Sequence, residues 1–88
     1  MKTRLGYTLR PLGKEFILVA EGLEAVDFSR MISMNESAAF LWKAVEGKDF
    51  DSAMLADLLM DEYGIDREMA EHDVVRLLET WKDANIIE

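Results

Sequence analysis

Residues 32 to 42 of this chain are Ile-Ser-Met-Asn-Glu-Ser-Ala-Ala-Phe-Leu-Trp, and within them an extended apolar run passes into an amphipathic helix without a linker. Residues 31 to 34 suit a short strand, and the Asn35 side chain can cap a helix by accepting a backbone N–H from residue 37 or 38. Ser33 and Glu36 also fit a capping box, which would start the helix two residues earlier. Gly47 is a natural stop. The residues on one helical face are Ala38, Leu41, Trp42 and Val45.

The residues before this corner predict strands. Residues 7 to 10 alternate apolar and polar side chains, and residues 16 to 20 are a continuous apolar run with strong β preference. Gly13 offers a turn between them, and Pro11 has no N–H to give to a ladder, so it belongs at a strand end or edge. Residues 26 to 28 lead toward the corner strand. We expect a three-stranded antiparallel sheet.

A second helix follows the first. Asp49 or Asp51 can cap it, and it runs to about Tyr63, where Gly64 ends it. Its apolar face is broad and consists of Met54, Leu55, Leu58 and Leu59.

The third helix is the longest. Asp66 can cap it, Asn85 is a suitable stop, and Ile86 and Ile87 can then fold back onto the core. Its apolar residues are Ala70, Val74, Leu77, Leu78 and Trp81. The predicted fold class is α+β, a winged helix-turn-helix-like βββααα arrangement in a single domain spanning residues 1–88.

Composition narrows the possible functions. The 88 residues contain no cysteine, so neither a disulfide framework nor a thiolate metal site is available. No apolar run approaches the roughly 20 residues that span a bilayer, and the first residues lack the apolar core of a signal peptide. We therefore expect a cytoplasmic protein without membrane contact.

Charge is distributed unevenly along the chain. The net charge is −8, and because residues 1 to 30 carry five basic and four acidic side chains, residues 31 to 88 carry −9. This negative field opposes the phosphate backbone of a nucleic acid and tolerates or attracts a basic peptide.

The ordered series of motifs resembles the PqqD family, which includes the small proteins of pyrroloquinoline-quinone synthesis and the recognition domains of pathways that modify ribosomally made peptides. The corner resembles the family's Leu-Asn-x-Thr/Ser-Ala-Ala-x-x-Trp, although Met34 stands in place of the first Leu and Asn85 stands where Gly is common. The resemblance covers roughly residues 7 to 88. Its motifs are Met34-Asn35-x-Ser37-Ala38-Ala39-x-x-Trp42, Gly47, Tyr63-Gly64-Ile65-Asp66, Asp73-Val74-x-x-Leu77-Leu78-x-x-Trp81 and Ile86-Ile87.

The resemblance implies a peptide chaperone without catalytic residues, cofactor or metal. Such a protein binds the leader of a precursor peptide as an added strand and presents it to a modifying enzyme, often a radical S-adenosylmethionine protein. The free strand edge that this requires could also pair with a second copy, so we expect a monomer or a weak homodimer. Carried onto this chain, the implied peptide-binding residues are Phe28, Arg30, Met31, Ile32, Ser33 and Met34 on the strand and Val74, Val75, Leu78, Trp81 and Lys82 on the third helix.

Helical geometry separates two rows within that third helix. The stripe of Ala70, Val74, Leu77 and Trp81 is expected in the core, whereas Val75, Leu78 and Lys82 form an adjacent row at i, i+3 and i+7. We expect this second row to face the groove.

Three other interpretations fit parts of the sequence. A winged-helix nucleic-acid binder would share the layout, although the third helix is acidic. The Asp51-Ser52 pair resembles the modified serine of acyl carriers, but the β-rich first third does not. His72 and Glu68 are spaced at i, i+4 as metal ligands can be, without two further convergent ligands.

Overall fold

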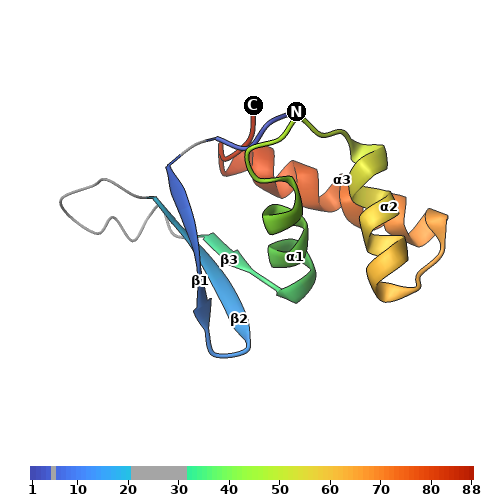
Figure 1. The fold of residues 1–88 in the computed structure, drawn as a ribbon, viewed down its shortest axis with the longest axis horizontal. Coiled ribbons are helices and arrows are strands. Elements are labelled where there is room, and N and C mark those ends of the chain that lie inside the picture. Colours follow the sequence, from blue (N-terminus) through green and yellow to red (C-terminus); the bar gives the residue numbers. More distant parts are fainter. Residues whose placement is uncertain (5, 21–31) are drawn as a thin grey trace.

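The computed structural model describes residues 1–4, 6–20 and 32–88, and Figure 1 shows them as a small sheet with three helices on one side. The strands are β1 (Tyr7–Leu12), β2 (Glu15–Ala20) and β3 (Ile32–Met34). The helices are α1 (Glu36–Val45), α2 (Ser52–Tyr63) and α3 (Arg67–Asp83). The βββααα order and the antiparallel β1-β2-β3 sheet confirm the predicted fold class.

The β1–β2 hairpin turns at Gly13, whose φ of +62° is a left-handed conformation that suits glycine. Pro11 lies near the end of β1, on the outer strand of the sheet, as a residue without an N–H requires. β2 is the central strand, and its Leu18 is fully buried beneath α1. The expected segment 26–28 lies outside the described residues.

Each helix begins at a side-chain cap. Asn35 Oδ1 accepts from the Ala38 N–H at 2.8 Å, Asp51 Oδ1 from Met54 at 2.9 Å and Asp66 Oδ1 from Met69 at 2.8 Å. The two-residue-earlier start at Ser33 is therefore not used, because Ser33 remains in β3. Asp51 rather than Asp49 caps α2.

The helices also end largely where expected. Gly64 follows α2 with φ +66°, and Asn85 follows α3 with φ +60°, an angle that asparagine tolerates better than most residues. Ile86 and Ile87 are buried, at 0% and 5% exposure. Met54 was wrongly assigned to the apolar face of α2; it is 42% exposed, and Ala56 is buried instead.

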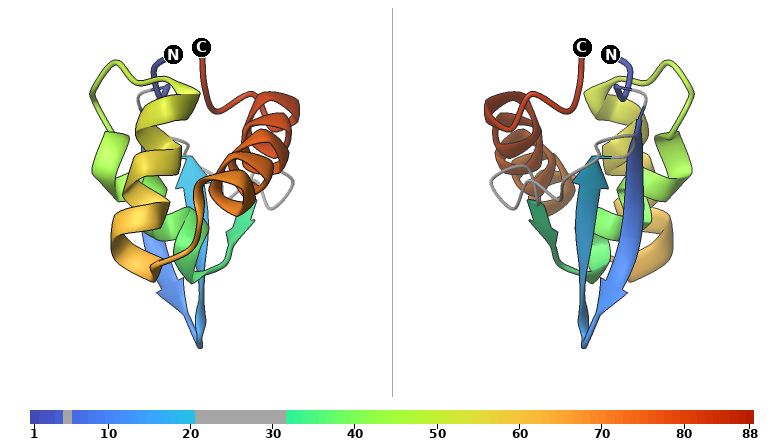
Figure 2. Two further views of the ribbon diagram at one scale, coloured as in Figure 1. Left: turned by 90° about the vertical axis from the view of Figure 1, so that its right-hand side faces the viewer. Right: turned by 90° about the vertical axis from the view of Figure 1, so that its left-hand side faces the viewer.

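The core lies between the sheet and the helices, with α1 against the sheet and α2 and α3 beyond it (Figure 2). Residues 1–4 close this core from the end where both termini lie (Figure 1). The backbones of Lys2 and Glu88 exchange hydrogen bonds, and the Arg4 N–H donates to the Ile86 carbonyl at 2.9 Å. The N-terminal segment therefore lies antiparallel to the tail after α3. The described part of the chain contains no helix long and apolar enough to cross a membrane.

Candidate functional site

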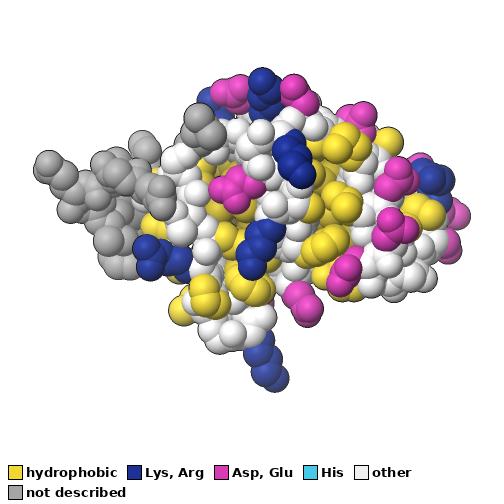
Figure 3. Space-filling view, viewed as in Figure 1, with side chains coloured by type: hydrophobic (Ala, Val, Ile, Leu, Met, Phe, Trp, Pro, Cys, Tyr) yellow, Lys and Arg dark blue, Asp and Glu magenta, His cyan; other side chains and the backbone are white. Residues whose placement is uncertain are grey.

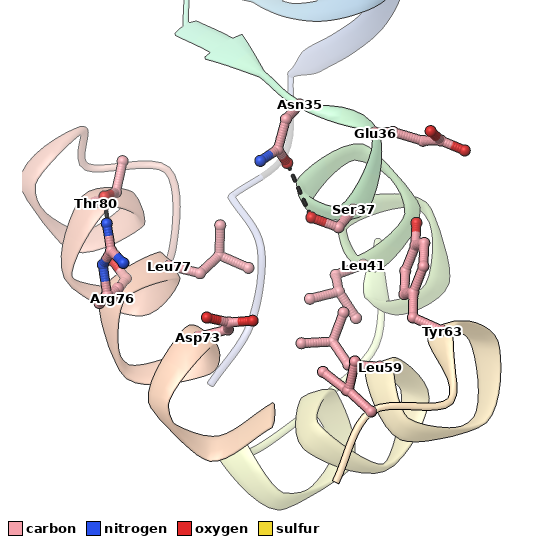
Figure 4. Close-up of a pocket in the computed structure, with 11 residues that line it drawn as sticks. Asn35, Glu36, Ser37, Leu41, Leu59, Tyr63, Asp73, Arg76, Leu77 and Thr80 are labelled. Atoms are coloured by element: carbon pink, nitrogen blue, oxygen red, sulfur yellow. Dashed lines mark hydrogen bonds between the residues drawn. The ribbon is translucent and has the colours of Figure 1, made fainter. Parts of the chain in front are cut away.

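A cavity of about 670 Å³ opens between α3, the beginning of α1 and the end of α2. Figure 4 shows its walls facing one another, with Leu77 and Asp73 projecting from α3 toward the side chains of α1 and α2. The apolar lining comes from three different helices and the turn between two of them: Leu41, Leu59, Ile65 and Leu77. Convergence of these elements gives the cavity a hydrophobic floor on a rigid frame.

The cavity has a polar rim: Asn35, Glu36, Ser37, Tyr63, Asp73, Arg76 and Thr80. Two rim groups are already occupied, because Asn35 Oδ1 accepts from both the Ala38 N–H and the Ser37 hydroxyl, the latter at 3.0 Å. Asp73 and Arg76 form no salt bridge with each other or with any other described residue, although they lie three positions apart on α3. Both charges are exposed and available to a bound molecule.

Tyr63 forms the wall at the end of α2. Its ring meets Phe40 edge to face, with centroids 6.0 Å apart and an angle of 90° between the planes. Partial burial, followed by the negative charges of Glu36 and Glu62, raises the pKa of the Tyr63 phenol above its ordinary value of 10.0. The phenol therefore stays protonated at neutral pH, where it can donate a hydrogen bond. The carboxylates of Glu36 and Glu62 give this wall a negative potential.

β3 leads directly into this cavity, because the rim residue Asn35 follows its last residue. β3 pairs with β2 in the register Phe16 with Met34, Ile17 with Ser33 and Leu18 with Ile32. No other described strand lies along the opposite edge of β3. The backbone along that edge can thus accept an added strand.

Side-chain direction along β3 follows from this register. Ile32 is cross-strand partner to the buried Leu18, so it shares the core-facing side of the sheet, as does Met34. Ser33 points to the other side and is exposed. A strand added beside β3 would therefore send alternate side chains toward the helices.

The predicted peptide-binding residues fall into distinct environments. Phe28, Arg30 and Met31 lie outside the described residues. Three are in the core at 3% exposure or less, namely Met34, Val74 and Trp81, and Leu78 is buried at 7%. Ile32 is half-buried, while Ser33, Val75 and Lys82 are exposed. None of the eight described residues lines the cavity.

The residues of α3 that do line the cavity form a different row from the one expected: Asp73, Arg76, Leu77 and Thr80. This row lies on one side of the buried stripe of α3, and Val75 and Lys82 lie on the other side. The buried stripe consists of Ala70, Val74, Leu78 and Trp81. Leu77, expected in the core, is half-buried at the cavity wall, and Leu78 takes the more buried position. The sequence did contain a signal for a leucine at the cavity wall, namely two consecutive leucines on one helix. Only one of two consecutive helical residues can point to the centre of the core, so the other lies at its border.

The interpretation of His72 and Glu68 as metal ligands gains nothing from the structure. Both line a shallow hollow at the start of α3 together with Asp66 and Met69. Asp66 is engaged there as the helix cap. No group of three or more potential ligands comes together within residues 1–4, 6–20 and 32–88.

The chain resembles known proteins in fold and in sequence. The solved structure of TbiB1 in complex with the TbiA(beta) leader peptide is similar in fold, with a TM-score of 0.72 and 20% identity, and the match covers 100% of this chain and 95% of that one. None of the curated proteins compared with the chain matches it. The sequence model of the family described as "Coenzyme PQQ synthesis protein D (PqqD)" matches residues 10–87. Since this match spans nearly the whole chain, the protein belongs to the PqqD family.

Proposed function

We propose that this protein binds the leader segment of a ribosomally made precursor peptide and presents the peptide to a separate modifying enzyme. The observation that carries the proposal is the placement of β3, whose outer edge is covered by no other described strand, directly beside a cavity with a hydrophobic floor. Membership of the PqqD family and the similarity to TbiB1, whose structure contains a leader peptide, support it.

Binding would combine two sources of affinity. The peptide backbone would pair with β3 through main-chain hydrogen bonds, which depend little on peptide sequence. Alternate peptide side chains would point toward the helices, and those beyond the end of β3 would enter the cavity. The cavity thus provides selection and the strand provides much of the affinity.

The binding surface follows from the predicted strand residues and the observed helix row. On the strand side it consists of Ile32, Ser33 and Met34, with Phe28, Arg30 and Met31 retained from the prediction. On α3 we replace the predicted row of Val75, Leu78 and Lys82 by the residues that line the cavity, with Leu77 as the main apolar contact. Val74 and Trp81 would support this wall from the core rather than contact the peptide.

The protein would act without catalysing a reaction itself. Two aliphatic hydroxyls line the cavity, and Ser37 donates to Asn35 Oδ1 while Thr80 donates to the Arg76 carbonyl. Neither donates to a basic group that would activate it as a nucleophile. The chemistry would belong to an enzyme partner, which the family resemblance suggests is a radical S-adenosylmethionine protein. The winged-helix alternative finds no comparable support, since the acidic α3 opposes insertion into a DNA groove.

Binding of the leader of a precursor peptide encoded beside this gene tests the proposal. Fluorescence anisotropy should show saturable binding by the wild-type protein, and Leu77→Ala should weaken it about tenfold, because about 1–2 kcal/mol of apolar contact is lost. Val75→Ala is the matched control on the same helix, since Val75 is 55% exposed and does not line the cavity. Absence of binding, or equal effects of the two variants, would overturn the proposal.

A further inference from the structure

We infer that the cavity selects a peptide segment in which a single basic residue, Lys or Arg, lies within two positions of a bulky apolar residue. Asp73 would hold the basic group, Glu36 would add negative potential at the opposite rim, and the apolar side chain would occupy the floor between the two walls. This inference rests on the proposed function and names the chemistry of the segment that the site accepts.

The two carboxylates belong to opposite walls of the same cavity. Glu36 lies at the start of α1 and Asp73 on α3. Figure 4 shows the Asp73 carboxylate directed from α3 into the space between the helices, whereas the Glu36 carboxylate extends along the rim beside Tyr63, away from α3. Neither carboxylate is engaged in a salt bridge with a described residue, so a bound cation would not have to displace an existing partner.

The surroundings add to this negative potential. Glu62 lies close enough to Tyr63 to act, with Glu36, on the phenol at the cavity wall. Figure 3 shows further acidic side chains gathered over the α2 end of the molecule. A cation at this end of the cavity would gain Coulomb energy from several carboxylates at once.

The floor accounts for the apolar neighbour of the basic residue. Leu41, Leu59 and Leu77 converge from the three helices, and a large side chain that reaches them exchanges water for apolar contact. Alternate residues of an added strand point toward the helices, so a basic residue two positions from the apolar one reaches the rim when the apolar one enters the floor. An apolar residue and a basic residue within two positions of each other fit this arrangement.

Arg76 limits the number of basic residues. It lines the cavity one turn after Asp73, and its guanidinium has no salt-bridge partner among the described residues. A run of several lysines or arginines would bring a second positive charge close to Arg76, which is unfavourable. The lining therefore favours one basic residue over a polybasic segment.

The test is selection of a phage-displayed library of random 12-residue peptides on the full chain. Three proteins are compared: wild type, the double variant Glu36→Gln with Asp73→Asn, and the control double variant Glu46→Gln with Asp83→Asn. The control makes the same change in net charge at the C-cap of α1 and at the last residue of α3, two positions that do not line the cavity. We expect wild type and control to enrich peptides with one Lys or Arg within two positions of a bulky apolar residue, and the cavity variant to lose this enrichment.

A synthetic copy of the most enriched peptide then measures the interaction. Replacing its basic residue by Gln should weaken binding to wild type about three- to tenfold, the range expected for one or two exposed charge pairs, and leave binding to the cavity variant unchanged. Enrichment of apolar peptides without a basic residue, or the same basic enrichment on all three proteins, would overturn the charge selection while leaving peptide binding intact. Failure to enrich any peptide would overturn both this inference and the proposed function.

Discussion

The indole rings of Trp42 and Trp81 meet edge to face in the centre of the core, with centroids 5.3 Å apart and an angle of 89° between their planes. Trp42 belongs to α1 and Trp81 to α3, and the two are 0% and 1% exposed. This contact fixes the separation of the two helices whose other sides form the cavity. The width of the cavity therefore depends on a pair of residues that do not line it.

We expect this pair to be energetically coupled. In a double-mutant cycle with Trp42→Leu and Trp81→Leu, each single change should be strongly destabilising, and their interaction energy should be about 0.5–1.5 kcal/mol. Urea unfolding followed by circular dichroism measures each term. A cycle that pairs Trp81→Leu with Phe40→Leu is the control, since Phe40 contacts Tyr63 instead, and should be additive. Additivity in the tryptophan cycle would contradict the coupling.

The Asn35 cap should contribute measurably to stability. Asn35→Ala removes the acceptor for the Ala38 N–H at 2.8 Å and should lower the free energy of unfolding by about 1 kcal/mol. Asn35→Ser keeps a capping oxygen and should cost only a few tenths of a kcal/mol. Thermal and urea unfolding of the two variants separate these outcomes, and equal stability of Asn35→Ala and wild type would show that the cap is unimportant.

Thr3 should hold the N-terminal segment in place. Its side chain is buried, and its Oγ1 accepts from the Gly47 N–H at 3.2 Å, which joins residues 1–4 to the turn after α1. Thr3→Val keeps the shape but removes the acceptor, so we expect a loss of about 1 kcal/mol in unfolding free energy. Thr3→Ser, which retains the hydroxyl, separates the hydrogen bond from the packing. A smaller loss for Val than for Ser would mean that packing of the methyl group dominates.

The titration of Tyr63 should respond to Glu36. Burial is the larger cause of the raised pKa and persists in Glu36→Gln, so the variant should lower the pKa toward 10.0 without reaching it. The ¹³C NMR signal of Tyr63 Cζ follows this titration, and Glu46→Gln, at the far end of α1, is the control. An unchanged Tyr63 pKa in Glu36→Gln would mean that the carboxylate does not act on this wall.

The same shift has a consequence for stability. Because the pKa in the folded state exceeds that in the unfolded state, folding disfavours the phenolate. The contribution of Tyr63 to stability is complete below pH 10 and is lost as the pH rises through the folded pKa. Tyr63→Phe should remove this part of the alkaline decline.

Local signals explain why most of the fold could be predicted. The caps at Asn35, Asp51 and Asp66 and the stops at Gly64 and Asn85 each depend on a few neighbouring residues, and all are found in the structure. The N-terminal segment could not be predicted in this way. Its partners, near residues 47–50 and 86–88, are distant in sequence, and residues 1–4 carry no periodic pattern.

The cavity-lining residues of α3 also could not be predicted from neighbouring residues alone. The resemblance to the PqqD family implied a groove between β3 and α3, but the side of the α3 stripe that borders the opening depends on how α3 is rotated against α1. That rotation is set by contacts such as Trp42 with Trp81, which join distant parts of the chain. The prediction therefore placed Leu77 in the core and Leu78 at the groove, whereas Leu77 lines the cavity and Leu78 is buried.

We expect a leader peptide to add to the outer edge of β3, which no other described strand covers. Hydrogen–deuterium exchange, measured by NMR with and without the leader of a precursor encoded beside this gene, tests it most directly. We expect the outward-facing backbone amides within Ile32–Met34 to become protected on binding, while the amides of the β1–β2 hairpin turn at Gly13 and Lys14 remain unchanged. Binding of the leader with no added protection anywhere in β3 would contradict the claim.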